Sequence, residues 1–200
     1  FISGKEIFKL LRDGGRYEDQ PPGVIPYLRS VNHYHNPITE KGFSGWFFGK
    51  VLAGESSKDW AQKPLGTQDP GGHYSWYDAR DYFYKALTST YKANRENNFA
   101  ETFRALGQLM HLVQDASVPA HTRDDFHIRF DYEKWAQNNI NINAINSTSF
   151  DKSILNRSTS DLPIANIFDT NQYMGKNPEI AVGSYIGLSE YTNANFFSED

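Results

Sequence analysis

Residues 99–121 read FAETFRALGQLMHLVQDASVPAH, a stretch that joins an apolar helical stripe to residue types that bind metals. The apolar residues recur at helical spacing, and Asn98 is a suitable residue to cap a helix that begins there. His111 and Asp115 are four residues apart, so on a helix they lie on one face. Together they can bind one cation, and His121, just beyond Pro119, can bind a neighbouring one.

Composition narrows the chemistry that such a site can use. The chain has 200 residues, which predicts one domain over residues 1–200 with a sizeable core. It contains no cysteine, so zinc would have to be bound by His, Asp and Glu. A net charge of −4 weakly disfavours non-specific binding of nucleic acid. No apolar run is long enough to span a membrane, and the many Asn and Tyr residues favour a secreted or periplasmic protein.

Helical patterns dominate the chain, and the predicted fold class is all-α. A capping-box pattern at residues 3–6 opens a first helix, which the glycine pair at 14–15 is expected to stop. A second capping-box pattern, Ser75–Asp78, opens a helix that is expected to continue to Tyr91. Two shorter helices are expected over residues 131–137 and near 179–197.

The remaining segments predict irregular structure. Residues 20–72 hold most of the prolines and many glycines, which indicates a long excursion of the kind that often carries function. Short helical pieces are expected around 43–52 and near Trp60, and residues 24–27 are a weak strand candidate. Residues 138–171, rich in Asn, Ser and Thr, are expected to be loop.

Histidine usage strengthens the metal hypothesis. His111, His121 and His127 fall within seventeen residues, interleaved with the acidic residues Asp115, Asp124, Asp125, Asp131 and Glu133. In a chain without cysteine this clustering is typical of sites for divalent metals such as zinc. The alternative is a set of surface histidines around a helix end. That alternative explains Asp115 poorly, because a carboxylate near a helix C-terminus is unfavourable without a cation.

The pattern LGxxxHxxxDxxxPxH over residues 106–121 closely resembles the signature of the zinc-dependent phospholipase C family. The same superfamily includes fungal zinc nucleases that cut single-stranded nucleic acid. The resemblance implies an all-α bundle with three zinc ions in a surface cleft. It also implies that His111 and Asp115 bind the first zinc, with Asp115 bridging metals, and that His121 and His127 bind the second.

The last ligand of the second zinc has two candidates. The family places a carboxylate at the start of the next helix, where this chain has Asp131 and Glu133. Glu133 is favoured because Tyr-Glu-Lys-Trp resembles the family's aromatic-Glu-x-aromatic context, and Asp131 is the alternative. Glu133 lies six residues after His127, so that choice requires His127 to lie in the loop before the helix.

An earlier segment carries a second resemblance. GGRYED at residues 14–19 and NHYHNP at residues 32–37 resemble the family's acidic turn and its histidine element. Asp19 and His33 would then complete the first zinc site, with Asp19 also the candidate general base. The alternative for Asp19 is a solvated loop carboxylate. His35 is expected to support the site or to be exposed rather than to bind metal. His73 is expected either to line the cleft or only to form part of the turn that begins the next helix.

The chain also departs from the family. Family enzymes bind the third zinc with their N-terminal amino group and an early histidine, whereas this sequence begins with Phe1 and has no histidine before His33. Two zinc ions are therefore expected, with a third only if upstream residues supply ligands. The sequence is interpreted as a fragment of a longer chain, with the resemblance covering about residues 1–137.

The expected activity is zinc-dependent hydrolysis of phosphodiesters, in the manner of a phospholipase C. Two divalent ions can polarise a phosphodiester and activate water for in-line attack. The nuclease branch carries a Gly-Gly-Asn element after its third histidine, and residues 121–127 lack it. A phospholipid or another phosphodiester is therefore the expected substrate. A single-strand nuclease is the first alternative, and a non-catalytic domain held together by metal is the second.

Overall fold

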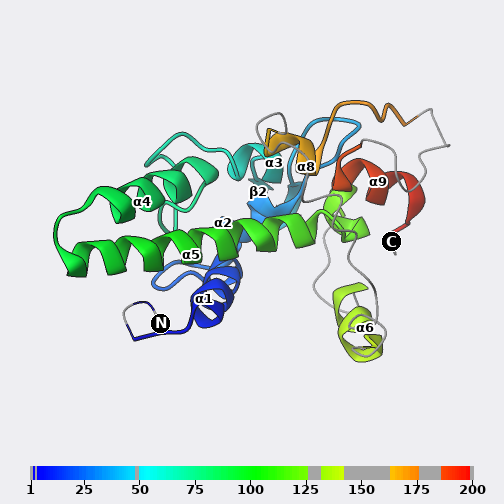
Figure 1. Ribbon diagram of the computed structural model, residues 1–200. Coiled ribbons are helices and arrows are strands. Elements are labelled where there is room, and N and C mark those ends of the chain that lie inside the picture. Colours follow the sequence, from blue (N-terminus) through cyan, green and yellow to red (C-terminus); the bar gives the residue numbers. More distant parts are fainter. Residues whose placement is uncertain are drawn as a thin grey trace.

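The longest helix, α5, is the element on which the other long helices pack. The computed structural model describes residues 2, 4–47, 50–125, 132–141, 163–175 and 186–198. Helices α1 and α4 both contact α5, which crosses the molecule in Figure 1. The elements, in chain order, are α1 (Ile7–Asp19), α2 (Tyr27–Ser30), the 3-10 helix η1 (Val31–His33), β1 (Ser44–Phe47), β2 (Lys50–Ala53), α3 (Ser57–Trp60), α4 (Trp76–Thr88), α5 (Lys92–Asp115), the 3-10 helix η2 (Pro119–Thr122), α6 (Tyr132–Asn139), α8 (Ala165–Phe168) and α9 (Leu188–Asn195).

Helix α1 does not stop at its glycine pair, so the predicted end of the first helix is wrong. Gly14 lies against α5, where a Cβ would come within 2.1 Å of the Arg104 carbonyl oxygen. From the other side, a Cβ on Gly107 would lie 2.0 Å from the Leu11 carbonyl oxygen. These glycines are therefore required by close helix packing, and α1 continues to Asp19. The predicted capping box is also wrong, since Glu6 is the N-cap and makes no side-chain cap bond.

Helices α4 and α5 form an antiparallel pair. The capping box at Ser75 and Asp78 is confirmed, with both reciprocal hydrogen bonds present. Helix α4 ends at Thr88 rather than Tyr91, and Tyr91 is instead the N-cap of α5. The predicted start at Asn98 is therefore wrong, and that residue lies inside the helix with its amide donating to the Asn94 carbonyl oxygen. Helix α5 contributes three residues, more than any other helix, to the buried core, which comprises Trp60, Ala61, Ala79, Ala105, Leu109, Leu112, Ala116 and Phe168.

A two-stranded antiparallel hairpin, β1–β2, occupies the segment expected to be helical around residues 43–52. Aromatic and β-branched residues in this run favour strand pairing. Gly54 lets the end of the hairpin approach the backbone of Val31 closely, since a Cβ there would lie 1.8 Å from the Val31 carbonyl oxygen. The strand candidate at 24–27 is wrong, because no strand forms there and Tyr27 begins α2.

The shorter helices agree in part with the sequence. Helix α3 confirms the helical piece near Trp60, and α6 overlaps the helix expected over 131–137. Helix α9 lies within the range 179–197, of which residues 179–185 are outside the described part. Helix α8 lies in the segment expected to be loop. The described part of the chain is mainly helical, and none of its helices is both long and apolar enough to cross a membrane.

Candidate metal centre

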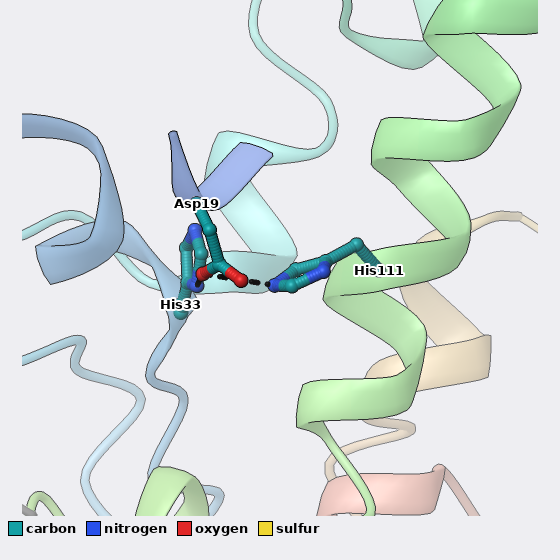
Figure 2. A group of neighbouring side chains, drawn as sticks. All are labelled: Asp19, His33 and His111. Atoms are coloured by element: carbon teal, nitrogen blue, oxygen red, sulfur yellow. Dashed lines mark ion pairs between the residues drawn. The ribbon is translucent and has the colours of Figure 1, made fainter. Parts of the chain in front are cut away.

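Five of the predicted ligands meet where α1, η1, α5 and η2 come together. Asp19 is the last residue of α1, and His33 ends η1. His111 and Asp115 lie on the last turns of α5, and His121 lies in η2. Figure 2 shows the side chains of Asp19, His33 and His111 directed toward one another from separate elements. Residues distant in sequence therefore share one site.

The spacing of four of these side chains suits a single ion. His33 Nδ1 lies 3.0 Å from Asp115 Oδ2 and 3.7 Å from Asp19 Oδ1. His111 Nε2 lies 3.3 Å from Asp115 Oδ2 and 3.4 Å from Asp19 Oδ1. Zinc bonds of 2.0–2.2 Å in a tetrahedron separate neighbouring ligand atoms by about 3.3–3.6 Å. The observed distances cluster around that separation.

Two of these ligand atoms lack the partners that buried polar atoms normally have. Both His111 Nε2 and Asp115 Oδ2 are buried, and neither atom makes a hydrogen bond within the described residues. Leaving such groups without a hydrogen bond is unfavourable, and each case calls for an explanation. A divalent cation between the imidazole and the carboxylate would satisfy both atoms, so the residues present fit a metal ion.

Asp115 also faces a third histidine, His121. Its Oδ1 atom lies 3.5 Å from His121 Nδ1, while Oδ2 faces His33 and His111. A carboxylate with one oxygen toward His121 and the other toward His33 and His111 has the arrangement of a ligand that bridges two metal ions. The histidine is positioned by the ring of Tyr34, at 4.6 Å between ring centroids.

The remaining predicted ligands cannot be placed beside His121. His127 and the alternative ligand Asp131 lie outside the described residues. Glu133 lies in the first turn of α6, and its side chain is likewise outside the description. Their assignment as ligands therefore stays a prediction.

Charge is concentrated at the site. Burial alone would raise the pKa of Asp115, but His121, His33 and His111 outweigh it and hold that pKa well below its usual value. Burial likewise opposes protonation of the histidines. Asp115 and Glu18 nevertheless raise the pKa of His33 to about 9, and Asp115 and Asp19 raise that of His111 to about 11. The metal-free site thus holds protons where a metal-loaded site would hold a cation.

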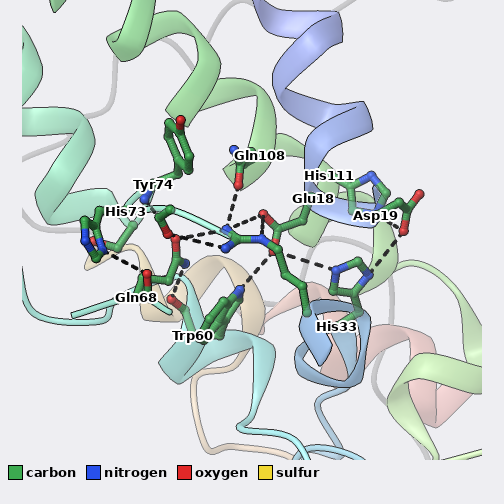
Figure 3. Close-up of polar contacts among 12 residues, drawn as sticks. Glu18, Asp19, His33, Trp60, Gln68, His73, Tyr74, Gln108 and His111 are labelled. Carbon is green, nitrogen blue, oxygen red and sulfur yellow. Dashed lines mark hydrogen bonds and ion pairs between the residues drawn. The ribbon is translucent and has the colours of Figure 1, made fainter. Parts of the chain in front are cut away.

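Sequence reasoning missed Glu18, the neighbour of Asp19. The two residues are adjacent on α1 and so project about 100° apart around the helix. Asp19 is the last residue of α1 rather than a loop residue, and its side chain is 51% exposed, whereas Glu18 is fully buried beneath the site. Glu18 accepts hydrogen bonds from Arg29 and from Trp60, and Figure 3 shows the bond from Trp60. The signal was present as an acidic pair, but only the helix shows which member faces inward.

His35 is buried in a neighbouring cluster. Its ring contacts Ser56 Oγ at 2.8 Å and Asp169 Oδ2 at 2.7 Å. Glu40 also lies near His35 and Asp169, so these three could formally hold a metal. The Lys58 ammonium group already pairs with both carboxylates and supplies the positive charge. This cluster therefore joins segments of the fold without an added cation.

His73 lies apart from the candidate metal centre. Its Nδ1 atom is 2.9 Å from the Gln68 carbonyl oxygen, in the turn that leads into α4. Figure 3 shows it well separated from His33 and His111. This position fits the helix-entry alternative.

Comparison of the chain with protein-family models, with curated proteins and with solved structures gave no match. The chemistry of this site must therefore be inferred from its residues and their geometry.

Proposed function

We propose that this chain is a zinc-dependent phosphodiester hydrolase that resembles the zinc-dependent phospholipase C family in its bundle and its ligands. The observation that supports the proposal is the meeting of two separate sequence motifs at one point. Asp19 and His33 come from the early motifs, and His111 and Asp115 come from the helical motif. The resemblance assigns both motifs to the same zinc.

The donor set favours zinc among divalent ions. Two imidazole nitrogens and two carboxylate oxygens are ligands that zinc accepts in a four-coordinate site. Zinc bound here would supply Lewis-acid charge, which lowers the pKa of water and stabilises negative charge on a phosphodiester during hydrolysis. A second ion would be held by Asp115, His121, His127 and Glu133.

The chain's own residues have distinct roles in this proposal. Asp115 is buried and joins the two groups of ligands through its two oxygens. Asp19 is half-exposed at the rim, where its carboxylate can accept a proton from an attacking water. His33 and His111 hold their imidazole rings on either side of Asp115.

A phospholipid or a related phosphodiester is the proposed substrate. The absence of a Gly-Gly-Asn element from residues 121–127 supports this choice over single-stranded nucleic acid. The net charge of −4 also favours a phospholipid substrate over nucleic acid, because a negative protein repels the phosphate backbone.

Hydrolysis of bis(p-nitrophenyl) phosphate tests the activity. Activity is expected in the zinc-loaded protein, to be lost in a chelator and to return when zinc is restored. His111→Ala should abolish it, whereas His73→Ala, which removes a histidine outside the site, should retain it. Equal activity with and without chelator would refute the proposal.

Two further comparisons separate the alternatives. Faster hydrolysis of phosphatidylcholine micelles than of single-stranded DNA is expected, and the reverse order would assign the nuclease function. Stoichiometric zinc binding without hydrolysis of any phosphodiester would instead identify a metal-stabilised, non-catalytic domain.

A further inference from the structure

Glu18 lies directly beneath the candidate metal centre and is held there by a buried network. Both Glu18 and its ion-pair partner Arg29 are fully buried. Burying such a pair rarely stabilises a fold more than apolar side chains of similar volume would. Its position one residue before Asp19 therefore suggests a role beyond stability.

The network fixes the orientation of the Glu18 carboxylate. Arg29 donates to Oε2 from Nε at 3.0 Å and from Nη2 at 2.8 Å, and Trp60 Nε1 donates to Oε1 at 2.9 Å. The guanidinium group also donates to oxygens of two other segments: Gln68, Pro70 and Gly72 in the loop before α4, and Gln108 in α5. Figure 3 shows this network extending toward His33. The carboxylate cannot rotate without breaking several of these bonds.

On one side, the Glu18 carboxylate faces His33, a predicted ligand of the candidate metal centre. Glu18 Oε1 lies 3.7 Å from His33 Nε2, an atom that is buried and has no hydrogen-bond partner within the described part of the chain. The other ring nitrogen, Nδ1, faces Asp115 and Asp19. His33 therefore lies between a fixed carboxylate and the centre.

We propose that Glu18 is a positioning residue for His33: its carboxylate favours the tautomer that carries the proton on Nε2 and so directs the Nδ1 lone pair into the metal centre. A carboxylate that faces the outer nitrogen of a metal-binding histidine stabilises a proton there, and losing such a group typically weakens metal binding 10–100-fold. The inference rests on the proposed metal centre and adds a residue that touches neither metal nor substrate.

The test compares two substitutions in the same buried network. Glu18→Gln removes the charge that faces His33 at almost constant volume. Gln108→Met removes an acceptor of Arg29 Nη2 but leaves Glu18 and His33 unchanged. Zinc affinity is measured by competition with a chelating dye, and the visible spectrum of the cobalt-loaded protein reports the ligand geometry.

The expected result is a zinc affinity about 10–100-fold weaker for Glu18→Gln, with an altered cobalt spectrum. Gln108→Met should match the wild type in both, even if it lowers the melting temperature. Equal losses in the two variants, or no loss in either, would overturn the proposal while leaving the metal centre intact. If the wild type binds neither metal, the metal centre and this proposal both fall.

A measurement on the wild type covers the case in which Glu18→Gln does not fold. In the zinc-loaded protein, NMR of the His33 ring should show an Nε2 proton shifted downfield, because it faces the Glu18 carboxylate. An Nε2 proton at the position of a histidine ring exposed to water would overturn the proposal.

Discussion

Asp115 is the residue that connects the whole candidate metal centre. Its Oδ2 atom faces His33 and His111, and its Oδ1 atom faces His121. The carboxylate lies at the C-terminal end of α5, where the helix dipole disfavours negative charge. The surrounding histidines or a cation must therefore stabilise it.

Asp115→Asn is expected to weaken zinc binding more than 100-fold, because a neutral amide cannot supply negative charge to two ions. Losing a residue that only hydrogen-bonds to a metal ligand costs 10–100-fold, and losing a ligand itself should cost more. Zinc titration against a chelating dye measures this loss. Asp81→Asn, which changes an aspartate paired with Lys85 on α4, is the matched control and should bind zinc normally. Equal affinity in the two variants would exclude Asp115 as a ligand.

Zinc binding is expected to release protons at pH 7, because the metal-free site has a pKa of about 9 for His33 and about 11 for His111. Zinc requires neutral imidazoles, so affinity should rise as the pH increases from 7 toward 9. Calorimetric titrations in buffers of different ionisation enthalpy count the protons. A binding enthalpy independent of the buffer would contradict this protonation pattern.

The same two histidines affect the stability of the metal-free protein. Their folded pKa values lie above the unfolded value of about 6.5. Their stabilisation is therefore complete below about pH 6.5 and disappears as the pH rises through 9 and 11. Denaturant unfolding in excess chelator should show stability falling over this range, and a rise there would contradict the assignment.

At the scale of elements, the contact between α1 and α5 positions Asp19 beside His111. Gly14 and Gly107 let the two backbones approach where any Cβ would meet a carbonyl oxygen. The site residues follow on the last turns of both helices. Close packing of these helices is thus a condition for the site.

Gly14→Ala is expected to lower the free energy of unfolding by about 1–3 kcal/mol through overpacking, and to weaken zinc binding by moving α1 away from α5. Urea unfolding and zinc titration measure both effects. Gly15→Ala is the control on the same helix, because its Cβ would meet only an ordinary contact at 3.6 Å from the Gly107 carbonyl oxygen. That variant should be neutral or more stable by up to about 1 kcal/mol. Equal destabilisation by both would contradict the packing explanation, because Gly15 has no close contact for a Cβ to disturb.

Local patterns explain which elements could be predicted. The Ser75 capping box depends on residues three apart, and the sequence reveals it directly. The end of α1 was mispredicted because Gly14 is required by Arg104, ninety residues away in sequence. The β1–β2 hairpin was missed because its apolar residues also fit a short helix, and strand pairing decides between the two.

At the scale of the molecule, the candidate metal centre joins segments that span residues 19–121. The pairing of His111 with Asp115 could be derived from helical spacing alone. The addition of Asp19 and His33 could not, because nothing in their spacing relates them to α5; only the family resemblance suggested it. Glu18 remained unrecognised because its role depends on contacts with Arg29 and Trp60.

A metal that joins these segments should stabilise the entire fold. Zinc at a thousand times its dissociation constant adds about 4 kcal/mol, which corresponds to roughly 10 °C in melting temperature for a chain of this size. Differential scanning calorimetry with zinc and with chelator measures the shift. His111→Ala should lose most of it, and a wild-type melting temperature that does not respond to zinc would contradict the metal link.

The most direct test of the metal centre is anomalous X-ray scattering at the zinc edge, from a crystal of the zinc-loaded chain. A peak is predicted in contact with His33 Nδ1, His111 Nε2 and the carboxylates of Asp19 and Asp115. No zinc peak within bonding distance of these four side chains, in a crystal grown with excess zinc, would contradict the account.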